Sequence, residues 1–405
     1  MWFEKTMAFV AISVAFMFLA LLVGIFRLMA LNFFVTGILV ELYALHSIIM
    51  VFGFLAVIIM SERVAGVRII PGAQKLKAPV MMVPFVTLGV VVETIGYMWQ
   101  VPTLRFLGAV LLMGGCVAFI ETLRFLKRNS EAKLSFDFMI LSVVSLLLAA
   151  MVSAFTIPVD DMGFIMLLLS FPVLFILGER IELTRIVASP TSNKGFRRVL
   201  VTAAASIILF AVGSGERFTM LANATFLIGS VLLLVVFLSV LIVENHNLRL
   251  LLKSPRPLQH YVSRHVRVAY GWALIGMFLA VGYALSGFEF DLYDPFIHSL
   301  TLGFIGTMML AHGPVILPGV LKRKFNEVKL TMLPLAVLTL SVVLRMGGEL
   351  FMLVSYSAAV RLTVGFSGWL VLVAVLLFLS SIVRGTTEPA TVVNHSPIVH
   401  RVTID

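Results

Sequence analysis

Twelve stretches of this chain are each apolar enough, and long enough, to cross a lipid bilayer as a helix. A spanning helix needs about 20 mainly apolar residues, because hydrocarbon holds no water and the backbone must satisfy its own hydrogen bonds. Of the 405 residues, 60% are hydrophobic and 12% are charged, which would leave a soluble domain with a mostly apolar surface. We therefore expect an all-α polytopic transmembrane bundle over residues 1–384 and a polar tail over residues 385–405. The expected spans are about 7–29, 37–60, 79–99, 104–126, 137–157, 162–187, 196–213, 218–243, 267–286, 295–320, 330–354 and 361–383.

Positive charge is concentrated in alternate connections between these stretches, and the net charge is +10. The intervening connections are short and neutral or acidic, as around Asp160 and from Glu289 to Asp294. Because Lys and Arg near span ends favour the cytoplasmic side, we expect both termini and every basic connection in the cytoplasm, and the protein in the plasma membrane of a prokaryote. The charge pattern therefore indicates the orientation of the spans in the membrane, and it indicates no nucleic-acid site. The basic connections contain Arg63, Arg68, Lys75 and Lys77; Lys127, Arg128 and Lys133; Arg185, Lys194, Arg197 and Arg198; Arg249, Lys253, Arg256, Arg264 and Arg267; and Lys322, Arg323, Lys324 and Lys329.

Several kinds of site are excluded by what the sequence lacks. Its single cysteine, Cys116, cannot form an internal disulfide or supply a cysteine-ligated iron–sulfur or zinc cluster. No phosphate loop, Ser-His-Asp arrangement, His-Glu-x-x-His motif or dinucleotide fingerprint is present. The first stretch is too long for a signal-peptide core and lacks a small-residue cleavage site, so we expect it to be the first spanning helix.

Two histidines lie fourteen residues apart in one apolar stretch, Pro295-Phe-Ile-His298-Ser-Leu-Thr-Leu-Gly-Phe-Ile-Gly-Thr-Met-Met-Leu-Ala-His312-Gly-Pro314. On an α-helix this spacing brings the imidazoles to within roughly 40° of each other, about 21 Å apart along the axis. No single metal ion could bind both, whereas two stacked cofactors could, as the haems of membrane cytochromes b do. The spacing therefore favours transmembrane electron transfer. The alternatives are a packing role for His298 and a role for His312 in capping carbonyls freed by Pro314.

A second histidine helix resembles the first over a short stretch. His46-Ser47-Ile-Ile-Met-Val-Phe-Gly-Phe and His298-Ser299-Leu-Thr-Leu-Gly-Phe-Ile-Gly both run from outside to inside in the expected topology. His46 then lies level with His298, and the two are expected to hold an outer haem b. The same alignment places Met60 opposite His312, which is expected to hold an inner haem if one exists. Met60, His265 and His246 compete as its second ligand, and the sequence does not separate one haem from two.

Charged residues near the outer third of the spans form a further group. The guanidinium fork matches a carboxylate, so Arg345 and Arg105 are candidates for haem propionates. Glu93 and Glu349 could accept protons from a quinol. The alternative is that these charges pair with one another and stabilise the outer end of the bundle. At the inner end, we expect a cluster of charges after Gly178 to reach the membrane interface and to pair there: Glu179, Arg180, Glu182 and Arg185.

The two histidine helices, with His46, His298 and His312, resemble the NnrS-like family of polytopic haem-containing membrane proteins. That family is linked with nitric oxide metabolism and is distantly similar to the haem–copper oxidases, and the twelve-span layout is similar too. The resemblance implies that the three histidines bind haem. The paired-histidine motif of a haem–copper active site, with its His-Tyr copper ligands, is missing, which speaks against copper and oxygen reduction.

We therefore expect a b-type haem protein that carries electrons across or into the bilayer, as a subunit or accessory of a respiratory chain linked to quinol or nitric oxide. One alternative is a secondary transporter, since the connection Ser61-Glu62-Arg63-Val-Ala-Gly66-Val-Arg68 faintly resembles a loop of the major facilitator superfamily. Another is a structural membrane anchor for an external cytochrome. The longest connection, about 244–266, is expected to join two bundles or to form a docking surface. Donor, acceptor, partner subunits and oligomeric state stay open.

Overall fold

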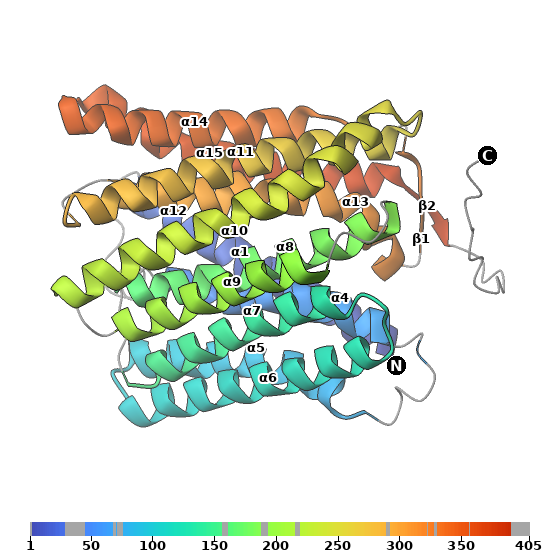
Figure 1. Ribbon diagram of the computed structural model, residues 1–405, viewed down its shortest axis with the longest axis horizontal. Helices are drawn as coiled ribbons and strands as arrows, with labels where there is room; N and C mark the ends of the chain where they lie inside the picture. The colour runs from blue at the N-terminus through green and yellow to red at the C-terminus, as the bar shows by residue number, and fades with distance from the viewer. Residues whose placement is uncertain are drawn as a thin grey trace.

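The computed structural model is an all-α bundle, and among its described residues twelve helical segments are long and apolar enough to span a membrane (Figure 1). This confirms the fold class expected from the sequence. The described residues are 2–28, 45–67, 70, 76–155, 161–187, 193–214, 219–288, 292–321, 323–327, 330–355 and 357–389. The predicted tail beyond residue 389 lies outside them.

Most spans are single α-helices, whereas the second and the tenth combine three helical segments each. The second span consists of α3 (His46–Ile48), the π-helix η1 (Ile49–Ala56) and α4 (Val57–Val67). The tenth consists of α12 (Tyr293–His298), the π-helix η3 (Ser299–Gly306) and α13 (Thr307–Leu321). The other spans are α1 (Trp2–Leu28), α5 (Ala78–Met98), α6 (Pro102–Arg128), α7 (Lys133–Ser153), α8 (Met162–Val187), α9 (Asn193–Gly213), α10 (Met220–Lys253), α11 (Pro257–Leu285), α14 (Leu333–Val354) and α15 (Ala358–Gly385).

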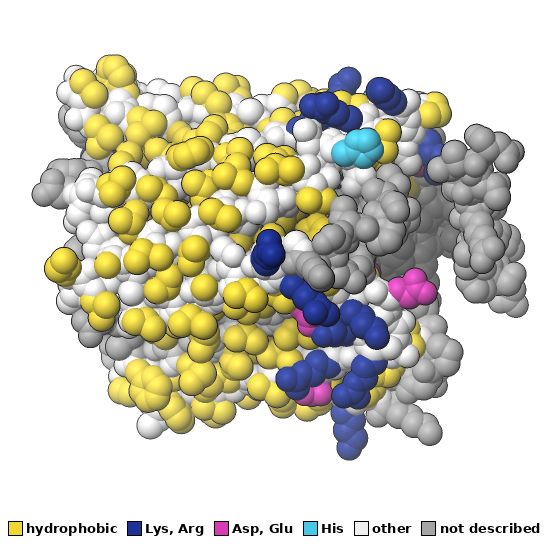
Figure 2. Space-filling view, in the orientation of Figure 1, with side chains coloured by type: hydrophobic (Ala, Val, Ile, Leu, Met, Phe, Trp, Pro, Cys, Tyr) yellow, Lys and Arg dark blue, Asp and Glu magenta, His cyan; other side chains and the backbone are white. Residues whose placement is uncertain are grey.

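The two ends of the bundle differ in charge. The first helix, α1, begins and the last, α15, ends at the same end of the molecule, at the right of Figure 1. In the face seen in Figure 2, Lys and Arg side chains gather toward that end and hydrophobic side chains cover the rest of the described surface. This arrangement agrees with the orientation expected from the basic connections, and the apolar band is the surface that lipid would contact. We call the basic end the inner end and the opposite end the outer end.

Three connections differ from the expected ones. α10 continues to Lys253 and α11 begins at Pro257, so helix replaces most of the long connection expected over 244–266. α4 continues to Val67, so the stretch from Ser61 to Val67 is helical, and Arg68 lies outside the described residues. A short β-ribbon joins β1 (Arg323–Phe325) to β2 (Thr386–Pro389), so the first residues of the expected tail pair with the chain after α13.

Helices α5 and α6 pack so closely at two glycines that no larger residue would fit there. A Cβ added at Gly108 would lie 2.6 Å from the backbone nitrogen of Glu93, and one at Gly96 would lie 2.6 Å from that of Arg105. Small residues permit such backbone contact between membrane helices. The contact positions Glu93 and Arg105 within the α5–α6 pair.

Candidate functional site

The second and tenth spans both line one cavity of about 810 Å³, together with α1, α8, α14 and α15. Its volume lies in the upper part of the range of roughly 300–1,000 Å³ typical of small-molecule sites. Most of its lining is apolar, and charged side chains occur at both ends. Five of the residues singled out in the sequence lie on its wall: His46, His298, His312, Arg345 and Glu349.

Each histidine helix enters a π-helix within three residues of its outer histidine. A π-helix has i→i+5 hydrogen bonds and occurs often at functional sites, since each such turn carries an extra residue and shifts the facing of side chains. The α-helical angle assumed between His298 and His312 therefore does not apply over Ser299–Gly306. Each π-segment packs a glycine on an aromatic ring: Gly53 on Phe16 and Gly303 on Trp272.

The His298 ring is held from its own helix. Its Nδ1 lies 2.9 Å from the backbone oxygen of Asp294 and 3.3 Å from the carboxylate Oδ1 of the same residue. Because both partners only accept hydrogen bonds, Nδ1 carries the proton and Nε2 carries the lone pair of the neutral ring. His298 lines the cavity, so this lone pair is available to a ligand there.

His312 shows the same arrangement at a deeper level. Its Nδ1 donates to the backbone oxygen of Met308 at 2.9 Å. Its Nε2 is buried and has no hydrogen-bond partner among the described residues. A buried nitrogen lone pair without a partner is costly in an apolar region, and a bound metal centre would relieve that cost.

The His46 ring lies next to α1 in the wall of the cavity. A Cβ at Gly24 of α1 would lie 3.4 Å from its Cε1 atom, an ordinary van der Waals distance, so α1 packs beside the imidazole at this glycine. His46 lines the cavity, as does Gly24. The residues present therefore fit a haem by three features: imidazoles on two facing helices, a partnerless Nε2, and an apolar wall with a glycine beside one ring.

The residues considered as the second inner ligand lie elsewhere, and His246 is exposed on α10. Met60 is completely buried and is not among the described residues that line the cavity. His265 is also completely buried, donates from Nδ1 to the Tyr261 oxygen at 2.8 Å and stacks on the Tyr261 ring with centroids 3.9 Å apart. His265 does not line the cavity either. The structure therefore brings none of these residues to the cavity that His312 lines.

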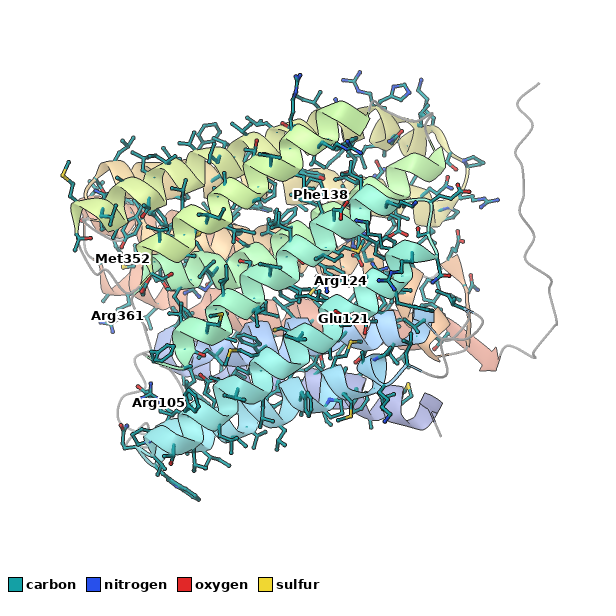
Figure 3. All side chains as sticks on the ribbon, turned by 60° about the horizontal axis from the view of Figure 1, so that its bottom comes forward. Arg105, Glu121, Arg124, Phe138, Met352 and Arg361 are labelled. Carbon is teal, nitrogen blue, oxygen red and sulfur yellow. The ribbon has the colours of Figure 1, made fainter. Side chains whose placement is uncertain are left out.

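Two of the charged candidates are likewise separate from the cavity. Glu93 is completely buried, and both its carboxylate oxygens lack a hydrogen-bond partner in the described part of the chain. The Arg105 guanidinium lies 5.9 Å from the centre of the Tyr97 ring. In Figure 3, Arg105 lies apart from Met352 and Arg361, two residues that line the cavity at its outer end.

The outer end of the cavity carries an ionic cluster. Arg345 donates from Nε and Nη2 to Oδ2 of Asp294, at 2.9 and 2.5 Å, and its Nε lies 3.2 Å from Oε1 of Glu349. Arg345 is thus paired with acidic side chains of the protein. This pairing is what the alternative prediction, made in place of a propionate contact, expected. Asp294 is the residue that sequence reasoning missed. Its position four residues before His298 was the available signal, because i and i+4 side chains meet on a helix.

The inner end holds two further ion pairs. Arg63 of α4 pairs with Glu179 of α8, and both Glu62 and Glu179 line the cavity. Arg180 pairs with Glu244 of α10, with side chains only 4% and 0% exposed. The expectation that Arg180 reaches the membrane interface is therefore wrong. It turns into the bundle because a carboxylate from another helix is buried beside it.

A family model described as a domain of unknown function (DUF8744) matches residues 7–386. No curated protein matches the chain.

Proposed function

This chain belongs to the DUF8744 family, a domain of unknown function, and we propose that it is a b-type haem protein that carries electrons across or into the bilayer. In this proposal it serves a respiratory chain as a subunit or accessory, linked to quinol or nitric oxide. His46 and His298 hold an outer haem, and His312 holds an inner one. The resemblance of the two histidine helices to the NnrS-like family supports the same function.

One observation carries the proposal. His298 and His312 each donate from Nδ1 to the carbonyl four residues earlier and line one cavity, so their Nε2 lone pairs are left for a metal. Metal-binding histidines commonly fix their second nitrogen in this way, which sets both the tautomer and the ring orientation. His265 has the same Nδ1 hydrogen bond and a buried Nε2 without a partner among the described residues, but it does not line the cavity, so the cavity is what distinguishes His298 and His312.

Haem, when bound, supplies one-electron chemistry, and the chain supplies ligands, orientation and an apolar surround. The mainly apolar wall of the cavity surrounds the imidazoles. Arg345 and Arg361 are the cavity-lining cations near the outer histidines, and they would balance propionate charge there. Glu349 lies beside Arg345 and is the remaining candidate for a proton or quinol contact, since Glu93 lies away from the cavity.

The test is the absorption spectrum and haem content of the purified protein and its histidine variants. We expect a b-type reduced-minus-oxidised spectrum for the natural chain. Replacing His46 or His298 by alanine should remove the outer haem, and replacing His312 should remove a separate inner one. His265→Ala is the matched control, because His265 has the same Nδ1 hydrogen bond but does not line the cavity.

Two results would count against this function. A haem content that no cavity-histidine variant lowers would reject the ligand assignment. A colourless preparation would reject the haem function itself. The secondary transporter is the second candidate, because the twelve-span bundle has a central cavity with charged groups at both ends. Substrate-dependent uptake by vesicles containing the colourless protein would support it.

A further inference from the structure

We propose that Asp294, held by Arg345, is the positioning residue of His298 and lowers the reduction potential of the outer haem. The inference rests on the proposed haem function. It concerns an acidic residue that lies at the start of the tenth span, where α12 begins at Tyr293. It assigns a role to the ionic cluster at the outer end of the cavity.

The contact between Asp294 and His298 is the first part of the argument. One residue offers the imidazole two acceptors, the backbone oxygen at 2.9 Å and Oδ1 at 3.3 Å from Nδ1. Both lie on the side of the ring away from Nε2. A ring that donates to two acceptors on a single turn of helix has little freedom to rotate, so its Nε2 keeps one direction.

Arg345 is the second part of the argument. It comes from α14 and uses two nitrogens, Nε and Nη2, on the other carboxylate oxygen, Oδ2. The guanidinium therefore leaves Oδ1 to His298. With a side chain only 9% exposed, Arg345 ties the tenth span to the eleventh and holds the aspartate carboxylate in place.

A negative charge on the far side of a ligand imidazole has a defined effect on iron. It makes the imidazole a better electron donor and so favours the ferric state over the ferrous state. The reduction potential is therefore lower than it would be with a neutral partner. His312 differs here, since among the described hydrogen bonds and ion pairs its Nδ1 has only the Met308 carbonyl. The effect should thus fall on one haem.

The experiment measures the midpoint potentials of the purified, haem-loaded full chain before and after Asp294→Asn. Asparagine preserves the side-chain shape but removes the charge. We expect the equilibrium constant for reduction of the outer haem to rise about tenfold, which is an upward shift in its midpoint potential of about 59 mV for one electron. The potential of the inner haem should stay the same. Asp137→Asn, which removes the remote partner of Lys127, is the matched control and should shift neither.

A second variant keeps the test independent of how well Asp294→Asn folds. Arg345→Lys retains the positive charge but loses the two-nitrogen fork, so we expect a broadened low-spin ferric electron paramagnetic resonance signal with a smaller shift in potential. Unchanged potentials in Asp294→Asn would overturn the positioning role while leaving haem binding intact. If Asp294→Asn does not fold, an unchanged resonance signal in Arg345→Lys would overturn it. A natural chain without haem would instead reject the proposed function, and this inference with it.

Discussion

At the scale of single residues, the chain buries ion pairs between helices whose other side chains are mostly apolar. Arg180 of α8 and Glu244 of α10 are buried together, and the Tyr270 hydroxyl of α11 donates to the second Glu244 oxygen at 2.5 Å. Three helices thus share one carboxylate. Charges inside a membrane domain are expensive unless paired, so their partners determine whether the bundle tolerates them.

We expect Glu244→Gln to destabilise the protein by about 3–5 kcal/mol, because it leaves the Arg180 guanidinium buried without a counter-charge. Thermal unfolding in detergent would measure the change. Glu121→Gln is the matched control, since Glu121 pairs with Arg124 on the surface of α6, where the side chains are 53% and 56% exposed. An exposed pair contributes roughly 0–1 kcal/mol, so the control should unfold near the natural temperature. Equal unfolding temperatures for both variants would contradict a structural role for the buried pair.

Sequence reasoning found single residues better than it found their neighbours. His46, His298 and His312 were predicted as candidates because imidazoles inside apolar stretches are unusual, and the structure places all three on one cavity. Their haem-binding role stays a prediction. Asp294 was read as a loop charge and Arg180 as an interface charge, because their partners lie on other helices. Pairing across helices is not encoded in spacing along one of them.

At the scale of elements, the π-helices are the feature that the sequence analysis did not anticipate. Hydrophobic periodicity predicts a helix but does not distinguish i→i+4 from i→i+5 hydrogen bonds over eight residues. The packing of Gly53 on Phe16 and of Gly303 on Trp272 depends on residues in α1 and α11, respectively. Such contacts help to select the π-form only after the helices have assembled.

Deleting one residue from η3, such as Thr301, should convert the segment toward α-helix and change the direction of His298 relative to His312. We expect the variant to insert and fold yet to lose at least one haem, measured as haem per protein. Thr301→Ala is the matched control, because it changes the same side chain and keeps the register. A deletion variant with full haem content would show that the π-segment does not set the direction of the ligands.

Spans themselves were predicted well because length and hydropathy are local properties. The ends were less accurate: α10 and α11 continue well into the expected connection, joined by Ser254, Pro255 and Arg256. Charged residues such as Arg249 mark the membrane boundary, but they do not end a helix. A hydropathy pattern therefore locates the apolar part of a helix and not its whole length.

At the scale of the whole molecule, depth in the membrane proved a partial guide to the site. Glu93 and Arg105 were grouped with Arg345 and Glu349 because all four belong to the outer third of their spans. The structure separates them laterally, since α5 and α6 form a closely packed pair whose charges do not reach the cavity. Depth fixes one coordinate of a residue in a bundle, and the other two depend on how the helices are arranged.

Orientation is the whole-molecule property that can be tested most directly. The two ends of α6 lie at opposite ends of the bundle, with Thr103 near its first residue and Asn129 just after its last. Basic residues accompany the Asn129 end, so we expect that end in the cytoplasm. The native Cys116 is completely buried and should not react with a bulky thiol reagent, which leaves a clean background.

We expect Thr103→Cys to react with a membrane-impermeant maleimide in cells whose inner membrane is intact, because Thr103 is exposed at the outer end of α6. Asn129→Cys, exposed at the inner end, should react only after that membrane is permeabilised. The natural chain controls for Cys116. If Asn129→Cys alone reacted in intact cells, the orientation of the protein would be the opposite of the one expected here. It would place the Asp294–Arg345 cluster on the cytoplasmic side, and the haem proposed near His298 would then face donors inside the cell.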